Sequence, residues 1–191
     1  MLAVIIRQKL QQNFRCLYFN SLPMVAGMRS YLAAAGVDVA KETDETSLML
    51  TSNQDHLVDG NFDPERMIQG LEDALQQALL DGYAGLWATG DMTWEFGPTK
   101  DFSKLVEYEW RLEELFRKHP QLNGICQYHA DTLPRAVLQK GLIVHRGLFI
   151  NETLSIINPH YHPPGTFDLE PSQEAELEEL LQRICNPQAA N

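Results

Sequence analysis

Basic residues are scarce in this chain. It carries 15 Lys and Arg against 26 Asp and Glu, a formal net charge of −11, and no run of basic residues. A protein neutralises nucleic-acid phosphates with clustered Lys and Arg, so this balance argues against a nucleic-acid-binding surface. Long hydrophobic runs are missing too, and the start, MLAVIIRQKLQQNFR, has a run of only six apolar residues, 1–6, before Arg7. That run is too short for a signal peptide or a membrane span, and we expect no membrane partner.

Cysteine is also scarce. Cys16, Cys126 and Cys185 are odd in number and far apart, so they indicate neither a disulfide framework nor a CxxC zinc site. A reducing cytosol suits such a chain, and we expect a cytoplasmic protein.

A phosphate-binding string is missing from the sequence. Such a loop requires Gly-x4-Gly-Lys-Ser/Thr, because its backbone N–H groups cradle the phosphates while the Lys and the hydroxyl engage phosphate and Mg²⁺. The string occurs nowhere in the chain. We therefore expect no nucleotide hydrolysis.

Strands and helices alternate along the 191 residues, a length that suits a single domain. Buried strands are predicted at 16–20, 47–52, 84–89 and 124–129, with further strand material in LIVH (142–145) and LFINETLSII (148–157). Helices are predicted at 24–36, 63–82, 102–120 and 132–141, closed by Gly36, Gly82, Pro120 and Gly141, with an acidic helix in the tail. This alternation predicts βαβ units, and hence an α/β fold whose mostly parallel sheet is flanked by helices.

Polar and aromatic residues gather where the predicted strands end. Asn20-Ser21, 51–54, 91–95, 127–129 and His145 each follow strand-like residues. In parallel α/β sheets, ligands bind in the crevice at the carboxyl ends of the strands. The sequence therefore predicts a ligand pocket at this edge of the sheet.

Four motifs in order resemble one family. GYAGLWATGDMTW, EYEWRLEELF, GICQYH and NPHYHPP resemble the MEDS domain, the methanogen/methylotroph sensory domain, from about Cys16 to Pro164. The resemblance implies a three-layer RecA-like sheet, related to RecA/KaiC-like ATPases, that senses small molecules. It also implies a signalling system, since the family often precedes histidine kinases or DNA-binding regulators.

The chain departs from the family pattern at both ends. Family members usually begin with a strand and a loop that correspond to the ATPase phosphate-binding region, and here that N-terminal βα unit is expected to be missing. We expect residues 1–14 to form a helix or an arm on the sheet, 15–168 to form the core, and 169–185 to form the acidic C-terminal helix. The acidic tail after Pro164 carries no recognisable output domain either. These departures favour a kinase or transcription regulator as a partner in trans, or a truncated chain. An uncovered sheet edge also favours a homodimer.

The GDMTWEF segment supplies the first candidate ligand-binding residues. Met92 and Trp94 would give apolar area, and Asp91 would give a fixed acceptor, with Glu95 beside them. The alternative is that Asp91 binds local backbone N–H groups and that Trp94 fills the core. Trp87 is at least as suited to the core as to an apolar pocket wall. Across the pocket we expect Gln127, Tyr128 and His129, because consecutive parallel strands end side by side.

Tyr108 and Glu109 lie among the apolar positions of their helix. Glu109 is therefore predicted to face inward, where a carboxylate must be paired or neutral. The hydroxyl of Tyr128 or a loop backbone is the expected structural partner, and ligand contact is the alternative.

The histidines raise a metal hypothesis. His129 and His145 follow predicted strands, and His160 and His162 lie in NPHYHPP, with Asp91 and Cys126 as companions. No spacing is diagnostic, however. A nucleophile pairing Cys126 with His129 or His145 is disfavoured as well, because alternation places Cys126 and His129 on opposite faces of a strand.

We therefore expect a small-molecule sensory module without a metal, a cofactor or catalytic residues. A metal-assisted hydrolase using the histidines and a pure protein-interaction module remain the alternatives. The expected ligand-binding residues are Asp91, Met92, Trp94, Glu95, Tyr108, Glu109, Gln127, Tyr128, His129, His145, His160 and Tyr161.

Overall fold

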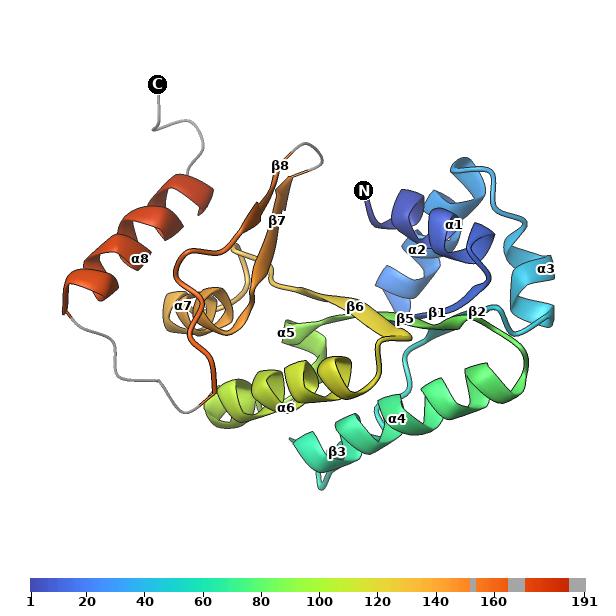
Figure 1. The fold of residues 1–191 in the computed structure, drawn as a ribbon, viewed down its shortest axis with the longest axis horizontal. Helices are drawn as coiled ribbons and strands as arrows, with labels where there is room; N and C mark the ends of the chain where they lie inside the picture. Colours follow the sequence, from blue (N-terminus) through green and yellow to red (C-terminus); the bar gives the residue numbers. More distant parts are fainter. Residues whose placement is uncertain (152–153, 165–170, 186–191) are drawn as a thin grey trace. The chain divides into compact units, whose positions relative to one another are not determined.

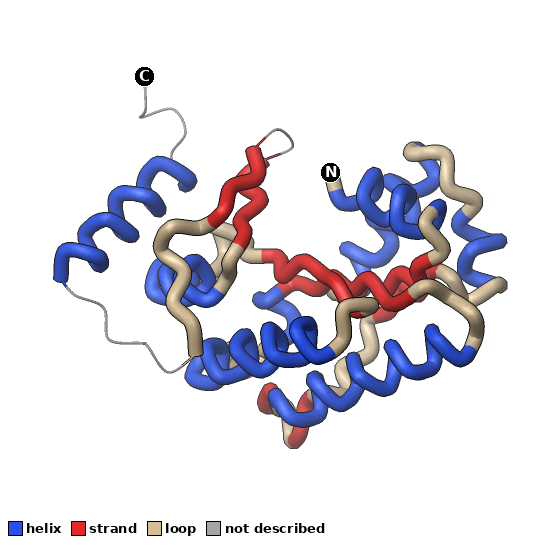
Figure 2. Tube along the Cα trace, viewed as in Figure 1, coloured by secondary structure: helices blue, strands red, loops and turns tan. Residues whose placement is uncertain are grey.

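The chain divides into two compact units. A computed structural model describes residues 1–151, 154–164 and 171–185 (Figures 1 and 2). Unit 1 comprises Met1–Asp101 and Arg111–Gln127, and unit 2 comprises Phe102–Trp110 and Tyr128–Asn191. The single domain that we expected from the length stays a prediction.

Unit 1 is built on a four-stranded parallel sheet with the strand order β2-β1-β5-β6. The strands are β1 (Phe14–Phe19), β2 (Leu48–Thr51), β5 (Gly85–Asp91) and β6 (Leu122–Gln127). Helices flank the sheet on both faces, which fits a RecA-like three-layer arrangement (Figure 1). The predicted α/β class with a mostly parallel sheet is confirmed.

One face of the sheet carries α1 (Leu2–Gln11) and α2 (Leu22–Ala34) (Figure 1). Their apolar residues form a single core with side chains of three strands, namely Ile6, Cys16, Tyr18, Val25, Met28, Leu32, Leu48 and Trp87. Trp87 is 3% exposed and belongs to this core. Helix α1 occupies the part of the chain for which we expected a helix or an arm.

The other face carries α4 (Pro64–Leu80), the clearest amphipathic helix of the sequence (Figure 1). Asp63 caps it by accepting a hydrogen bond from the backbone N–H of Arg66 at 3.0 Å, and Pro64 takes its first position. Gly82 follows its end with φ +87°, a conformation that glycine adopts without strain. The predicted start and end of this helix are confirmed.

Short elements connect the larger ones in unit 1. The loop after β2 contains the hairpin of β3 (Leu57–Val58) and β4 (Asn61–Phe62), and α3 (Val39–Asp44) precedes β2. The GDMTWEF segment forms α5 (Met92–Glu95) directly after β5. The β3–β4 hairpin was not among the predicted elements, although Asp59-Gly60, with φ +50° and +77°, is the turn pair typical of a two-residue hairpin loop.

Helix α6 (Leu105–Lys118) follows the short 3-10 turn Phe102–Lys104 and runs across the boundary between the units. Unit 2 also contains α7 (Arg135–Val144) and α8 (Pro171–Cys185). Its antiparallel hairpin pairs β7 (Gly147–Asn151) with β8 (Leu154–Ile157). None of the helices that the structure describes is both long and apolar enough to span a membrane.

The strand predicted at LIVH is wrong, because 142–144 continue α7 and His145 is its C-cap residue. A short apolar run satisfies a buried strand and a buried helix equally well, and periodicity alone does not separate them. Gly141 likewise does not end the helix. It lies buried within α7, where a Cβ would stand 2.6 Å from Cε1 of the Tyr128 ring.

Candidate functional site

A cavity of about 390 Å³ opens in unit 1 at the carboxyl ends of β1 and β2. Strand β2 is an edge strand of the four-stranded sheet. The apolar part of the cavity lining comes from β1 and α4, namely Leu17, Phe19, Met67, Gly70 and Leu71. Ligands of open α/β sheets bind at this edge. We expected the pocket at the ends of residues 84–89 and 124–129, whereas this cavity lies at the ends of β1 and β2.

Polar side chains complete the cavity lining. They follow β2 or belong to α4, and they are Thr51, Asn53, Asp55, His56, Arg66, Gln69 and Asp73. Several hold one another: the side chain of Gln69 donates to Oδ1 of Asp73 at 2.8 Å, and Arg66 donates to the backbone oxygen of Asp55 at 3.5 Å. An apolar surface with a few fixed polar groups is typical of small-molecule sites.

His56 is the most buried polar residue of the cavity lining, at 8% exposure. Its Nε2 lies 2.8 Å from the backbone oxygen of Glu95, and its ring centroid is 5.7 Å from Trp94 and 5.8 Å from Phe62. A carbonyl oxygen only accepts, so Nε2 carries the hydrogen. Burial lowers the pKa of His56 below its ordinary value, because the low-polarity surroundings disfavour the charged ring.

The GDMTWEF segment lies behind this cavity lining. Oδ1 of Asp91 accepts hydrogen bonds from the backbone N–H groups of Thr93 at 2.7 Å and Trp94 at 3.1 Å, so Asp91 caps α5. Asp91 thus makes the local backbone contacts that we considered as the alternative to ligand binding. The Trp94 ring lies 6.3 Å from that of Phe19 and supports two lining residues, Phe19 and His56, without lining the cavity itself.

Met92 and Glu95 are buried, Glu95 at 1% exposure. A Cβ at Gly90 would overlap Oε1 of Glu95 and the Phe19 ring, so glycine is what allows β5 to approach both side chains. Gln127 is the register partner of Asp91, and its amide donates to Oγ1 of Thr89 at 3.1 Å. The predicted adjacency of the ends of β5 and β6 is confirmed.

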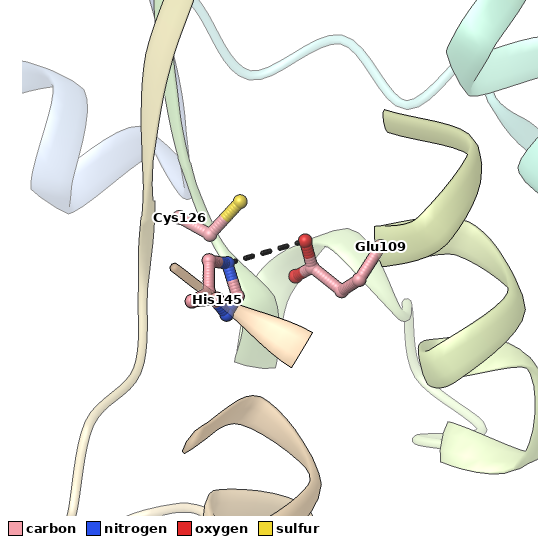
Figure 3. Close-up of side chains that lie close together, drawn as sticks. All are labelled: Glu109, Cys126 and His145. Carbon is pink, nitrogen blue, oxygen red and sulfur yellow. Dashed lines mark ion pairs between the residues drawn. The ribbon is translucent and has the colours of Figure 1, made fainter. Parts of the chain in front are cut away.

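Unit 2 brings together Glu109, Tyr128 and His145. The Tyr128 hydroxyl donates to Oε1 of Glu109 at 2.6 Å, and Nε2 of His145 lies 3.3 Å from Oε2 (Figure 3). Glu109 is 4% exposed, so the inward carboxylate and its Tyr128 partner are confirmed. Cys126, drawn in the same view, belongs to unit 1.

His145 is held from both sides within unit 2. Its Nδ1 donates to the backbone oxygen of Gly141 at 2.7 Å, one turn back in α7. Its other ring nitrogen, Nε2, faces the Glu109 carboxylate. Its ring meets the Tyr128 ring edge-on at 5.6 Å. The cluster ties α6, α7 and the Tyr128 segment together.

The remaining predicted residues are engaged locally. The Asn158 side chain is hydrogen-bonded to three other residues. Its Nδ2 donates to the backbone oxygens of Leu142 and His145, and its Oδ1 accepts from the backbone N–H of His160 at 3.0 Å. Nδ1 of His162 donates to the backbone oxygen of His160 at 2.8 Å. The guanidinium of Arg146 lies over the Tyr161 ring, 5.1 Å from its centroid.

Tyr108 is buried. The backbone oxygen of His129 accepts hydrogen bonds from the N–H groups of Thr132 at 3.1 Å and Leu133 at 3.0 Å.

Sequence reasoning missed His56, Phe19 and the cavity-lining residues of α4. Residues 51–54 stood out as strand-end polar groups, and extending that interval by two residues would have included His56.

Comparison with known proteins identifies the family. The searches of curated proteins and of solved structures returned no match. The family model of the MEDS domain, described as the MEthanogen/methylotroph, DcmR Sensory domain, matches residues 1–146. That match covers the sheet of unit 1 and extends through α7, so the chain belongs to the MEDS family of sensory domains.

Proposed function

We propose that the protein is a small-molecule sensory module that binds its ligand in the cavity of unit 1. The observation that carries this proposal is the cavity itself, about 390 Å³ in volume, with apolar lining from β1 and α4 and fixed polar groups from the segment after β2. Its volume falls in the range of small-molecule pockets, roughly 300 to 1,000 Å³. Membership of a sensory family supports the same function.

The proposal extends to a signalling partner in trans, either a kinase or a transcription regulator. Occupancy of the cavity would reach such a partner through the residues that support the lining, including Trp94 behind Phe19 and His56. The structure gives no disulfide to Cys16, Cys126 or Cys185 among the residues it describes, and the proposal includes a reducing compartment such as the cytoplasm.

Filling the cavity tests the proposal. Gly70 lines it from α4, and a Cβ at this position would meet no atom within 4 Å, so Gly70→Leu should fold and occupy the space. The matched control is Gly27→Leu, a glycine of another helix, α2, with equally open surroundings that does not line the cavity. Both variants place leucine in a helix, at positions where a Cβ would meet no atom within 4 Å.

The readout is the affinity for two small aromatic probes, indole and benzofuran, measured by calorimetry and by the shift in Tm. A ligand that binds the folded state raises stability by RT ln(1 + [L]/Kd), so the two measurements should agree. We expect binding to the wild-type protein and to Gly27→Leu, with at least a tenfold loss in Gly70→Leu. Unchanged binding in Gly70→Leu, or no binding of either probe to the wild-type protein, would contradict the proposal.

A further inference from the structure

We infer that the cavity of unit 1 selects neutral molecules with an apolar body and one N–H or O–H donor, and that Nδ1 of His56 accepts this donor. The inference rests on the proposed function, since it names the chemistry of the same cavity. Three observations carry it. The imidazole of His56 has a fixed orientation, this orientation leaves the lone pair of Nδ1 without an internal partner in the described part of the chain, and the charged side chains of the cavity lining are mostly acidic.

The His56 ring has little freedom to turn. Its side chain is more than nine-tenths buried, and it packs against Trp94 and Phe62 with centroid distances of 5.7 and 5.8 Å. The hydrogen bond from Nε2 to the backbone oxygen of Glu95, 2.8 Å long, fixes the remaining rotation. The ring is therefore preorganised, and a ligand does not have to immobilise it on binding.

Nδ1 remains as an acceptor. Because Nε2 carries the hydrogen, the neutral ring has a lone pair at Nδ1, and the described part of the chain offers this atom no hydrogen-bond partner. His56 lines the cavity, so the lone pair is the polar group that the ring can present to a ligand. Burial opposes protonation of the ring, which keeps the lone pair available.

The charges of the cavity lining disfavour anions. Asp55 and Asp73 supply two carboxylates against the single guanidinium of Arg66. The chain as a whole carries a formal charge of −11. An acidic ligand would therefore meet like charge and a lone pair, whereas a hydroxyl or N–H group would meet an acceptor.

Indole and benzofuran separate this inference from the proposed function. They have nearly the same shape, and only indole carries an N–H donor. We expect the wild-type protein to bind indole about fivefold more tightly than benzofuran, the ratio that one net hydrogen bond supplies. In His56→Phe, which keeps an aromatic ring in the stack, indole should bind only as well as benzofuran does. Benzoate should bind more weakly than either.

The outcomes are distinct. If both probes bind the wild-type protein equally and Gly70→Leu removes both, the inference is overturned and the cavity function stands. If indole keeps its advantage in His56→Phe, the inference is overturned as well. If neither probe binds the wild-type protein, the cavity function falls and the inference falls with it.

A second measurement needs no variant and covers the case in which His56→Phe does not fold. A long-range ¹H–¹⁵N spectrum of the wild-type protein reports which imidazole nitrogen of His56 is protonated. We expect a hydrogen on Nε2 and a bare Nδ1 whose resonance shifts when indole is added and stays in place with benzofuran. A hydrogen on Nδ1, or the same shift with both probes, would overturn the inference.

Discussion

His56 combines burial, a fixed ring and a titratable group at the edge of the cavity. The ordinary pKa of histidine is 6.5, and burial holds the folded-state pKa of His56 below it. Between the two values the unfolded chain binds a proton that the folded chain does not. The free energy of unfolding is therefore highest above pH 6.5 and falls as the pH drops through the interval, until the folded chain is protonated too.

Urea unfolding of the wild-type protein and of His56→Phe between pH 8 and pH 5 measures this effect. The other titrating groups are common to both chains, so the difference between their unfolding free energies isolates His56. We expect the unfolding free energy of the wild-type protein minus that of His56→Phe to be constant above about pH 7. Below pH 6.5 this difference should decline, with a slope of at most about 1.4 kcal/mol per pH unit. Parallel curves over the whole range would show that His56 titrates alike in both states.

At the scale of elements, α5 links β5 to the back of the cavity lining. It has only four residues, and Asp91 accepts two of its N-terminal N–H groups. The backbone oxygen of Glu95 at the other end receives the hydrogen bond from His56. The cap of a short helix and the orientation of the cavity histidine are thus parts of one arrangement.

Removing the cap tests this arrangement. Asp91→Ala leaves the N–H groups of Thr93 and Trp94 without their acceptor and should lower the free energy of unfolding by about 0.5 to 2 kcal/mol. Asp91→Asn keeps an acceptor oxygen and should cost less, with the ranking measured by urea unfolding. Equal losses in the two variants would mean that the charge of Asp91, and not its capping oxygen, stabilises the fold.

The elements of this fold differ in how far the sequence could predict them. Helix α4 combines a capping Asp63, Pro64, a long apolar stripe and a closing glycine, and every one of these signals points to the same helix. The run at 142–144 has no such capping or helix-ending residues, and its apolar residues suit a strand or a buried helix. Tertiary packing decides it, since Gly141 must lie inside α7 for the helix to approach the Tyr128 ring.

At the scale of the whole molecule, the sequence predicted the edge of the sheet but not the strands. It predicted a pocket at the ends of residues 84–89 and 124–129, whereas the cavity of unit 1 lies at the ends of β1 and β2. The carboxyl edge of a parallel sheet follows from strand–helix alternation. The side chains that line the cavity come from β1, from the end of β2 and the segment after it, and from α4, and no periodicity of the sequence shows that these segments meet. Asp91 and Trp94 stand out in the sequence because they are unusual in a loop, yet one caps a helix and the other supports Phe19 and His56.

The arrangement of the whole sheet also bears on nucleotide chemistry, because a RecA-like sheet suggests an ATPase. In unit 1, only Asn20 and Ser21 join β1 to α2, and no Gly-x4-Gly-Lys-Ser/Thr string occurs anywhere in the chain. Asp91 ends β5, where a strand-end acid of such an enzyme would lie, but its Oδ1 is used to cap α5. A strand-end acid alone does not supply the backbone N–H groups and the Lys with which a phosphate-binding loop holds the phosphates.

We therefore expect no release of phosphate from ATP or GTP in the presence of Mg²⁺ above the rate of a protein-free blank. Asp91→Asn provides the matched control, because it keeps an oxygen for the helix cap and removes the acid. Residual activity that is equal in the wild-type protein and in Asp91→Asn marks a contaminant, since a strand-end acid would be required for authentic turnover. Turnover in the wild-type protein that Asp91→Asn abolishes would show that the sheet retains a working nucleotide site.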